Sequence, residues 1–227
     1  MNKTKNITNE IVTEYMNQFY QPPDPRLLKL RQQAENRNIP IILRETEDFF
    51  GVLLSIVQPK RILEIGTAVG YSAAYFAIKT GGQVVTIERD PQFANEAAFN
   101  IEELGLKSQI RLIQGDGVQS TIQLAAQGEA DFDLVFIDAA KSHYKAFLDG
   151  ALPLCHEGTV ILSDNVLFRG RVASDIYDPD KKHKTSIRKL REYVEYIYSH
   201  PRLQTSVIAC GDGVAISRVK GEEHCHC

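Results

Sequence analysis

A strand-turn-helix segment at residues 62–72 constrains the fold of this chain more than any other part of the sequence. It reads ILEIGTAVGYS, so an apolar run passes one acid and then two glycines, Gly66 and Gly70. Glycine has no Cβ and tolerates positive φ, which lets a ligand approach the backbone of such a turn closely. Proteins of the α/β class bind nucleotide-type cofactors at this kind of strand end. The segment therefore predicts an α/β sheet with a cofactor site at this turn.

The spacing of the glycines separates two kinds of cofactor. Dinucleotide sites use G-x-G-x-x-G, with the pyrophosphate at the helix N-terminus. Here the middle glycine is missing, and Glu64 precedes the turn. An acid repels a pyrophosphate but attracts a cation, so the turn favours S-adenosylmethionine (SAM), which carries sulfonium and ammonium groups. The alternative is an ordinary tight turn between a strand and a helix.

Apolar runs typical of strands alternate with helical segments from residue 61 onward. The expected parallel strands are Arg61–Ile65, Gln83–Glu88, Gln109–Gln114, Asp133–Asp138 and Thr159–Ser163. Continuous apolar strands interleaved with helices indicate a parallel sheet covered on both faces. Leu203–Ala209 and Val214–Val219 are joined by CGDG, which predicts an antiparallel hairpin. We therefore expect a Rossmann-like α/β fold with a seven-stranded, mostly parallel sheet, where a dinucleotide-binding fold has six strands.

The first 58 residues predict a helical extension ahead of this sheet. Apolar residues recur at helical spacing in Ile7–Phe19, and further helices are expected at Arg26–Asn36 and Glu45–Val57, with prolines between them. We expect one domain, residues 1–227, made of the extension (1–58), a Rossmann-like core (59–220) and a tail (221–227). The tail ends in HCHC, which could capture a soft metal but is more typical of a frayed terminus.

Composition narrows the class of protein. The 227 residues are 43% hydrophobic and 24% charged, with a net charge of −3, so the chain lacks the global basic field of many nucleic-acid binders and any such contact must be local. There is no run of about 18 apolar residues and no apolar signal sequence, so we expect a cytoplasmic protein with no membrane partner. The four cysteines form no paired framework, which agrees with a reducing compartment.

Each of the five expected parallel strands ends in or beside a carboxylate. These acids are Glu64, Glu88, Asp116, Asp138 and Asp164. A single strand-end acid is commonly a helix cap, but five along one edge indicate a binding site, since ligands lie at the carboxyl ends of parallel strands. Glu88 ends the second strand, where an acid can accept both ribose hydroxyls. Asp116 is flanked by glycines and suits an adenine amino group.

A second group of residues has the chemistry of a metal site. Asp138, Asp164 and Asn165 offer two carboxylates and an amide from neighbouring strand ends, a set of hard oxygen donors that suits Mg²⁺. Lys141 follows Asp138 by three residues, on the same side of the next helical turn. A neighbouring dication would favour its neutral amine, which makes Lys141 a candidate general base. The alternatives are a simple Asx turn at Asp164 and a solvated surface lysine.

These motifs together resemble the metal-dependent class I SAM O-methyltransferases that include catechol and caffeoyl-CoA O-methyltransferases. The matching residues are Glu64-Ile-Gly66, Gly70-Tyr71-Ser72, Glu88, Gly115-Asp116, Asp138-Ala-Ala-Lys141 and Asp164-Asn165. The likeness runs from Ile41 through the hairpin at Gly211-Asp212-Gly213, and it implies the class I methyltransferase form of the Rossmann-like fold. Since members are often dimers, it also implies a homodimer.

The resemblance assigns roles to individual residues. The implied cofactor-binding residues are Ile42, Glu64, Gly66, Tyr71, Ser72, Glu88, Asp116, Gly117 and Asp138. Among these, Ser72 and the Gly66 turn would hold the methionine part of SAM, while Asp116 and Gly117 would hold the adenine. The resemblance also implies that Asp138, Asp164 and Asn165 hold Mg²⁺, with Asp138 and Lys141 acting in catalysis. The family often has a small residue other than glycine at position 117, so Gly117 departs mildly from its pattern.

The acceptor is less constrained than the donor. Mg²⁺ with three protein ligands can accept two adjacent substrate oxygens, which both a catechol and a 5-hydroxyuridine offer. Within the family the chain most resembles bacterial tRNA 5-hydroxyuridine methyltransferases, which make 5-methoxyuridine at the wobble position, through 62–72, 136–141, 164–170, 172–173 and 211–217. This resemblance makes tRNA 5-hydroxyuridine the expected acceptor. Basic residues at 169–171, 181–184 and 188–191 could contact the phosphates of a tRNA anticodon loop, although charge runs are often solvated helix faces. A catechol-type phenol is the alternative acceptor, and a non-catalytic nucleotide-binding module is the alternative to an enzyme.

Overall fold

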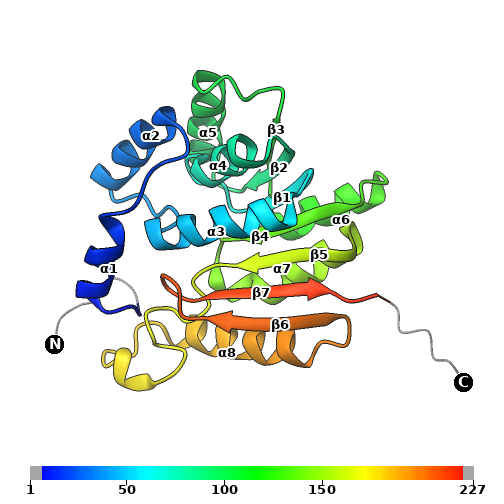
Figure 1. Ribbon diagram of the computed structural model, residues 1–227. Helices are drawn as coiled ribbons and strands as arrows, with labels where there is room; N and C mark the ends of the chain where they lie inside the picture. The colour runs from blue at the N-terminus through cyan, green and yellow to red at the C-terminus, as the bar shows by residue number, and fades with distance from the viewer. Residues whose placement is uncertain (1–6, 222–227) are drawn as a thin grey trace, which may run out of the picture.

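A computed structural model describes residues 7–221 of the chain. Its centre is a seven-stranded sheet in the order β3-β2-β1-β4-β5-β7-β6 (Figure 1). The strands are β1 (Arg61–Ile65), β2 (Gln83–Glu88), β3 (Ile110–Gln114), β4 (Phe132–Ile137), β5 (Cys155–Ser163), β6 (Leu203–Ile208) and β7 (Val214–Val219). Strands β1 to β5 pair in parallel, whereas β7 runs antiparallel to both β5 and β6. The fold class predicted from the sequence is confirmed.

Helices cover both faces of this sheet. The helices that follow the strands are α4 (Tyr71–Thr80), α5 (Pro91–Glu103), α6 (Gly117–Ala126), α7 (Tyr144–Ala151) and α8 (Lys184–Ser199). One hydrophobic cluster joins α4 to the side of the sheet that carries Leu134 and Phe136, and a second joins α6, α7 and α8 to the side that carries Val135 and Ile137. Successive residues of β4 thus point into opposite cores, as expected for a strand buried on both faces.

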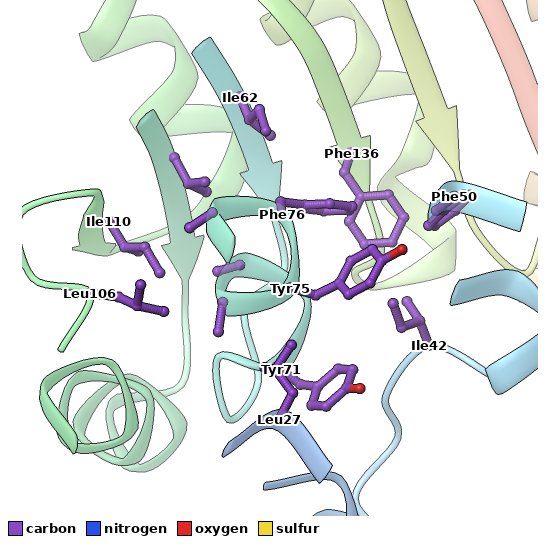
Figure 2. Packing of buried hydrophobic residues seen from close by; sticks show 14 of the residues in the cluster. Leu27, Ile42, Phe50, Ile62, Tyr71, Tyr75, Phe76, Leu106, Ile110 and Phe136 are labelled. Atoms are coloured by element: carbon purple, nitrogen blue, oxygen red, sulfur yellow. The ribbon is translucent and has the colours of Figure 1, made fainter. Parts of the chain in front are cut away.

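The helical extension adds α1 (Glu10–Asn17), α2 (Pro25–Asn36) and α3 (Arg44–Val57). Helix α2 begins with proline at its first position, where the missing N–H costs nothing, and Asp24 caps it by accepting from the Arg26 N–H (2.8 Å). Helices α2 and α3 pack on the α4 side of the sheet (Figure 1). In Figure 2, Leu27 and Ile42 lie near Tyr71, and Phe50 lies near Phe136.

Several predicted boundaries were wrong in detail. The first helix spans Glu10–Asn17 because Asn9 caps it through the Ile11 N–H (2.9 Å), and none of its residues is buried. Strand β5 begins at Cys155, four residues before the prediction, since Cys155 pairs with Phe132 across an irregular stretch of β4 and β5. The short helices η1 (Lys141–His143), η2 (Leu152–Leu154) and η3 (Asp175–Tyr177) had not been predicted. The HCHC tail lies outside the described residues.

The strand order places a topological switch point between β1 and β4. Connections from β1 lead outward through β2 to β3, whereas those from β4 lead the other way to β5. In sheets of this kind ligands bind at the carboxyl ends of the strands where the order reverses. In residues 7–221, no helix is long and apolar enough to cross a membrane.

Candidate active site

The glycine turn after β1 is shaped by a close approach of two strand ends. Gly66 has φ +101°, and a Cβ at this position would lie 2.0 Å from the carbonyl oxygen of Asp138 after β4. Only glycine fits this position, because the approach leaves no room and the backbone is left-handed. Gly70 has φ +84° and precedes the first residue of α4. The turn therefore brings bare backbone to the switch point, as the sequence predicted.

Glu88 at the end of β2 holds this turn in place. Its Oε2 accepts the backbone N–H groups of Thr67 (3.1 Å) and Ala68 (2.8 Å), and its Oε1 accepts the N–H of Asp90 (2.8 Å). A carboxylate has about four acceptor positions, so these bonds leave capacity for ribose hydroxyls. Glu88 thus shapes the turn in addition to the role predicted for it.

A cavity opens at the switch point beside this turn. Its lining comes from the carboxyl ends of β1, β2, β3 and β4 and comprises Ile65, Gly66, Ala68, Ile87, Glu88, Arg89, Phe93, Gly115, Asp116, Gly117, Asp138, Ala139, Ala140, His143 and Phe147. Five predicted cofactor residues are among them, and Ile42, Glu64, Tyr71 and Ser72 lie outside the lining. Ile42 belongs to the helical extension and is buried in the hydrophobic cluster on the α4 side of the sheet, at 2% exposure.

Glu64 lies beneath the turn, fully buried in β1. Its Oε2 accepts the hydroxyl of Thr86, and its Oε1 makes no hydrogen bond of ordinary length among the described residues. Burial raises the pKa of this carboxyl to about 7. The side chain of Ser72 lies close enough to this carboxyl to oppose the rise in its pKa. A buried carboxylate oxygen without a partner is costly, so the site fits a cofactor that carries positive charge.

The loop before α6 forms another part of the cavity wall, through Gly115, Asp116 and Gly117. Asp116 caps α6 by accepting the N–H groups of Val118 (3.0 Å) and Gln119 (3.1 Å), so the helix-cap alternative is confirmed for this residue. A Cβ on Gly117 would lie 2.8 Å from side-chain atoms of both Ile65 and Phe147. The tight fit explains why glycine stands here, where the family often has another small residue.

The predicted metal residues gather at the ends of β4 and β5. Asp164 is 2% exposed, and its Oδ1 accepts the N–H of Asn165 (2.7 Å). Lys141, at the start of η1, donates from Nζ to Asn165 Oδ1 (2.9 Å). The Asp164 backbone N–H bonds the carbonyl of Ile137 (3.1 Å), which fixes Asp164 beside Asp138 on the adjacent strand.

The electrostatics of this group fit a cation. Burial raises the pKa of Asp164 to about 8, with a further contribution from the charge of Asp138. Burial also raises the pKa of Asp138, although Lys141 opposes the shift. Two neighbouring carboxylates that resist ionisation are stabilised by an added positive charge. Within residues 7–221, no three His, Cys, Asp or Glu side chains gather as a metal site. The group therefore offers two carboxylates and one amide, oxygen donors of the kind that Mg²⁺ prefers.

Two residues that the sequence did not point to support this group. Tyr144 of α7 is buried and donates its hydroxyl to the backbone carbonyl of Asp164 (2.9 Å). Asp212, in the loop between β6 and β7, is 7% exposed, and its side chain accepts the N–H of Arg169. Its carbonyl also accepts the N–H of Leu167 (3.2 Å). The hairpin loop therefore anchors the segment that directly follows Asn165.

The basic segments beside this loop are largely paired with nearby acids. Arg191 forms an ion pair with Asp175 (2.8 Å). Lys189 (2.8 Å) and Arg188 both form ion pairs with the same acid, Glu192. Lys182 lies 3.3 Å from Asp180. These acids cancel part of the local positive charge that the sequence suggested for phosphate contacts, since Arg188 and Lys189 share the single carboxylate of Glu192.

Known proteins are similar to this chain in sequence and in fold. The family model described as O-methyltransferase matches residues 22–220. A catechol O-methyltransferase from Niastella koreensis is 34% identical over 170 residues, covering 73% of this chain and 77% of that protein. An O-methyltransferase from Bacillus cereus, solved with S-adenosylhomocysteine, has a TM-score of 0.80 at 30% identity and covers 92% of this chain and 97% of its own. TomG from Streptomyces achromogenes, an O-methyltransferase solved with SAM, has a TM-score of 0.80 at 28% identity. The match covers 97% of this chain and 100% of the TomG chain.

Fold, strand-end site and relatives together define a SAM-dependent methyltransferase. Its sheet ends in the antiparallel hairpin that the sequence predicted, and its cavity lies at the switch point. Within that class, the chain belongs to the O-methyltransferase family. The protein is therefore an enzyme, and a non-catalytic nucleotide-binding module is excluded.

Proposed function

We propose that this enzyme is a Mg²⁺-dependent O-methyltransferase that transfers the methyl group of SAM to one of two vicinal hydroxyls of a catechol-type phenol. The observation that carries the proposal is the position of Asp138, which both lines the cavity and lies beside Asp164 and Asn165. A donor bound at the β1–β3 ends and an acceptor bound at the β4–β5 ends would meet there. The similarity to catechol and caffeoyl-CoA O-methyltransferases supports this class of acceptor.

The residues around Asp138 have separate roles in this proposal. Asp138, Asp164 and Asn165 would hold Mg²⁺, which supplies Lewis acidity that lowers the pKa of a bound hydroxyl. Lys141, whose Nζ lies 2.9 Å from Asn165 Oδ1, would take the hydroxyl proton as general base. Gly66, Glu88, Asp116 and Gly117 would orient the donor, and alignment of the two reactants supplies much of the rate.

A tRNA anticodon loop bearing 5-hydroxyuridine is the second candidate acceptor. Its support is the resemblance at 164–170 and the aromatic-basic surface where Phe168 lies against Arg171 (4.9 Å to the ring centre) and His183. Stacking aromatics beside guanidinium groups are typical of RNA contacts. The pairing of the neighbouring cations reduces this support, so the phenol is the preferred acceptor.

The state of the protein in the cell is also part of the proposal. We propose a single domain that acts in the cytoplasm as a homodimer. Support for the dimer comes from large apolar side chains exposed on the helical extension, including Ile11, Phe19, Val52 and Ile56, since exposed apolar patches commonly mark interfaces. Light scattering on the purified protein would test the stoichiometry.

Radiolabelled SAM distinguishes the two acceptors. The enzyme is offered 3,4-dihydroxylated phenols and, separately, hypomodified tRNA that carries 5-hydroxyuridine. We expect transfer to the phenols that depends on the second hydroxyl and disappears with EDTA, returning when Mg²⁺ is added. Transfer to tRNA with none to phenols would overturn the acceptor, and full activity without metal would overturn the Mg²⁺ assignment.

A further inference from the structure

A buried polar cluster connects the helical extension to the start of α4. It consists of Arg31 of α2, Glu47 of α3, Tyr71 of α4 and Tyr20 from the segment between α1 and α2. Arg31 and Glu47 are each only 1% exposed. A charged pair this deep is expensive to desolvate and tolerable only when hydrogen bonds satisfy it. We call these four residues the Arg31 cluster.

The guanidinium group of Arg31 is held on every side. Its Nη2 bonds the carboxylate of Glu47 and the backbone carbonyl of Ile42 (3.0 Å). Its Nε bonds the hydroxyls of Tyr71 (3.1 Å) and Tyr20 (3.2 Å). The guanidinium carbon also lies 4.6 Å from the centre of the Tyr71 ring, a distance at which cation–π attraction adds to the contact.

Glu47 completes the cluster from the opposite side. It accepts the Tyr71 hydroxyl at Oε2 (2.7 Å) and the Tyr20 hydroxyl at Oε1 (2.8 Å). Its backbone carbonyl accepts the hydroxyl of Tyr75, one turn further along α4 (2.8 Å). Helices α3 and α4 are thus joined by two hydrogen bonds, from the hydroxyls of Tyr71 and Tyr75 to Glu47. These bonds add to the apolar packing between the two helices, part of which Figure 2 shows.

Both groups that Arg31 fixes belong to residues predicted to bind the cofactor, although neither residue lines the cavity itself. Tyr71 is the first residue of α4, directly after Gly70 of the glycine turn, and Ile42 is the residue expected to border the cofactor from the helical extension. The rigid, planar guanidinium group of Arg31 therefore sets the distance between the main chain at Ile42 and the glycine turn that precedes α4. A lysine could not make these contacts at once, because its ammonium lacks the fork geometry of arginine.

We propose that Arg31 is a positioning residue for the methyl donor: it holds the Ile42 main chain and the start of α4 in the geometry that binds SAM. The inference rests on the proposed cofactor site. A merely structural ion pair would contribute to stability without changing the affinity of the folded enzyme for SAM. Binding couplings are reciprocal, so SAM should also stabilise the Arg31 cluster.

The main test replaces Arg31 by lysine and measures steady-state kinetics well below the melting temperature. Arg31→Lys is expected to raise KM for SAM about tenfold, the effect of losing one charged hydrogen bond, while kcat at saturating SAM stays within about twofold. Arg37→Lys is the matched control, because Arg37 follows the same helix but forms an exposed ion pair with Glu96. A wild-type KM in folded Arg31→Lys would refute the proposal.

A second variant covers the case in which Arg31→Lys does not fold. Tyr71→Phe keeps the ring and removes only the hydroxyl that bonds Arg31 and Glu47, so we expect a smaller rise in KM for SAM, about threefold. If Tyr71→Phe binds SAM as tightly as the wild type in calorimetry, the cluster has no positioning role. Hydrogen exchange supplies a readout independent of turnover: SAM should slow amide exchange in α2 of the wild type and much less in Arg31→Lys.

Failure of the cofactor site itself is recognised separately. Glu88→Ala removes a residue that lines the cavity and lies outside the Arg31 cluster. Unchanged SAM affinity in Glu88→Ala would refute the proposed cofactor site. Weak binding in Glu88→Ala together with normal binding in Arg31→Lys and Tyr71→Phe would refute only the positioning role.

Discussion

The five acids at the carboxyl ends of the parallel strands fall into two groups, one at β1–β3 and one at β4–β5, and the two groups make different contacts. At the β1–β3 edge (Glu64, Glu88, Asp116), the carboxylate of Glu88 accepts hydrogen bonds from backbone N–H groups of the glycine turn. That of Asp116 accepts them from N–H groups of α6. At the β4–β5 edge (Asp138, Asp164), burial raises the pKa of both carboxyls, and the charge of Asp138 raises the pKa of Asp164 further. At the first edge, two of the three acids hold backbone N–H groups, and Glu64 alone resembles the carboxyls of the second edge, with a pKa that burial raises to about 7. At the second edge, both carboxyls would be stabilised in their charged form by an added cation.

This difference between the two edges indicates which of them determines specificity for the methyl donor and which for the methyl acceptor. A backbone cradle recognises a ligand by shape, as the close contacts of Gly66 and Gly117 require. Neighbouring carboxylates instead recognise charge and leave the form of the bound molecule to the surrounding loops. We therefore expect variants at the β1–β3 edge to change the affinity for SAM, and variants at the β4–β5 edge to change the rate of transfer.

Asp138 joins the two edges, and its loss should have the largest effect. Asp138→Ala removes both a cavity wall and half of the carboxylate pair, so we expect transfer to fall by at least about 10³-fold, as when a Lewis-acid site is lost. Single-turnover assays with labelled SAM measure the rate, and calorimetry measures SAM affinity. Asp116→Ala is the contrast, since it should weaken SAM binding and leave kcat nearly unchanged. A catalytically normal Asp138→Ala enzyme would contradict the comparison.

Gly66→Ala should cost stability at the point where the edges meet. The new Cβ would overlap the Asp138 carbonyl at 2.0 Å in a left-handed backbone, so β1 and β4 must separate. We expect a loss of about 3 kcal/mol in the free energy of unfolding, the scale of overpacking with added strain. Urea denaturation measures it. Gly81→Ala is the control, because Gly81 has φ +66° but no atom within 4 Å of the added Cβ, so it isolates backbone strain from overlap.

Glu64 predicts a pH dependence that belongs to the β1–β3 edge. Its pKa is about 7 in the folded chain against 4.5 in the unfolded one, so the folded state holds the proton more tightly. Stability is then full below about pH 4.5, falls as pH rises to about 7, and is constant above it, a loss of about 3 kcal/mol from this group.

Glu64→Gln cannot ionise, and this separates its contribution from that of Asp164, whose raised pKa has the same sign. We expect the variant without SAM to lose less stability than the wild type between pH 5 and 7.5 in urea denaturation. Saturating SAM should make the pH-dependent losses of stability in the variant and the wild type more similar, because the cationic groups of SAM favour the ionised form of Glu64. Parallel stability curves for the two proteins would show that Glu64 is already ionised in the folded chain.

The sequence predicted the parts of this site that depend on local pattern. Apolar runs ending in an acid located the five strand ends, and the glycine spacing located the turn, because both follow from contacts within a few residues. Tyr144 and Asp212 were missed because their roles depend on partners 20 and 43 positions away in the chain. Arg31 looks like a surface residue of an amphipathic helix, and only the packing of α2 against α3 and α4 shows it to be buried.

Asp212→Asn tests whether the hairpin serves the β4–β5 edge alone. The amide can still accept the Arg169 N–H but lacks the charge that faces Lys141, Arg169 and Arg171. We expect kcat to fall about tenfold, a change of about 1.4 kcal/mol, with KM for SAM unchanged. Asp175→Asn, at an exposed acid paired with Arg191, should leave both constants at wild-type values. A raised KM for SAM in Asp212→Asn would mean that the hairpin also shapes the donor site.

The smallest effect is expected on α8, outside both edges. Arg188 forms an exposed i,i+4 pair with Glu192, and such pairs contribute about 0.3–0.5 kcal/mol. Arg188→Ala should therefore change stability by less than about 0.5 kcal/mol and leave transfer to phenols unaltered. The same variant sharpens the choice of acceptor, because a phosphate contact would show as weaker tRNA binding and a shallower dependence of affinity on salt. If Arg188→Ala and Arg188→Glu both bind hypomodified tRNA as tightly as the wild type does, this arginine makes no phosphate contact. Its charge then interacts only with Glu192 on the same helix.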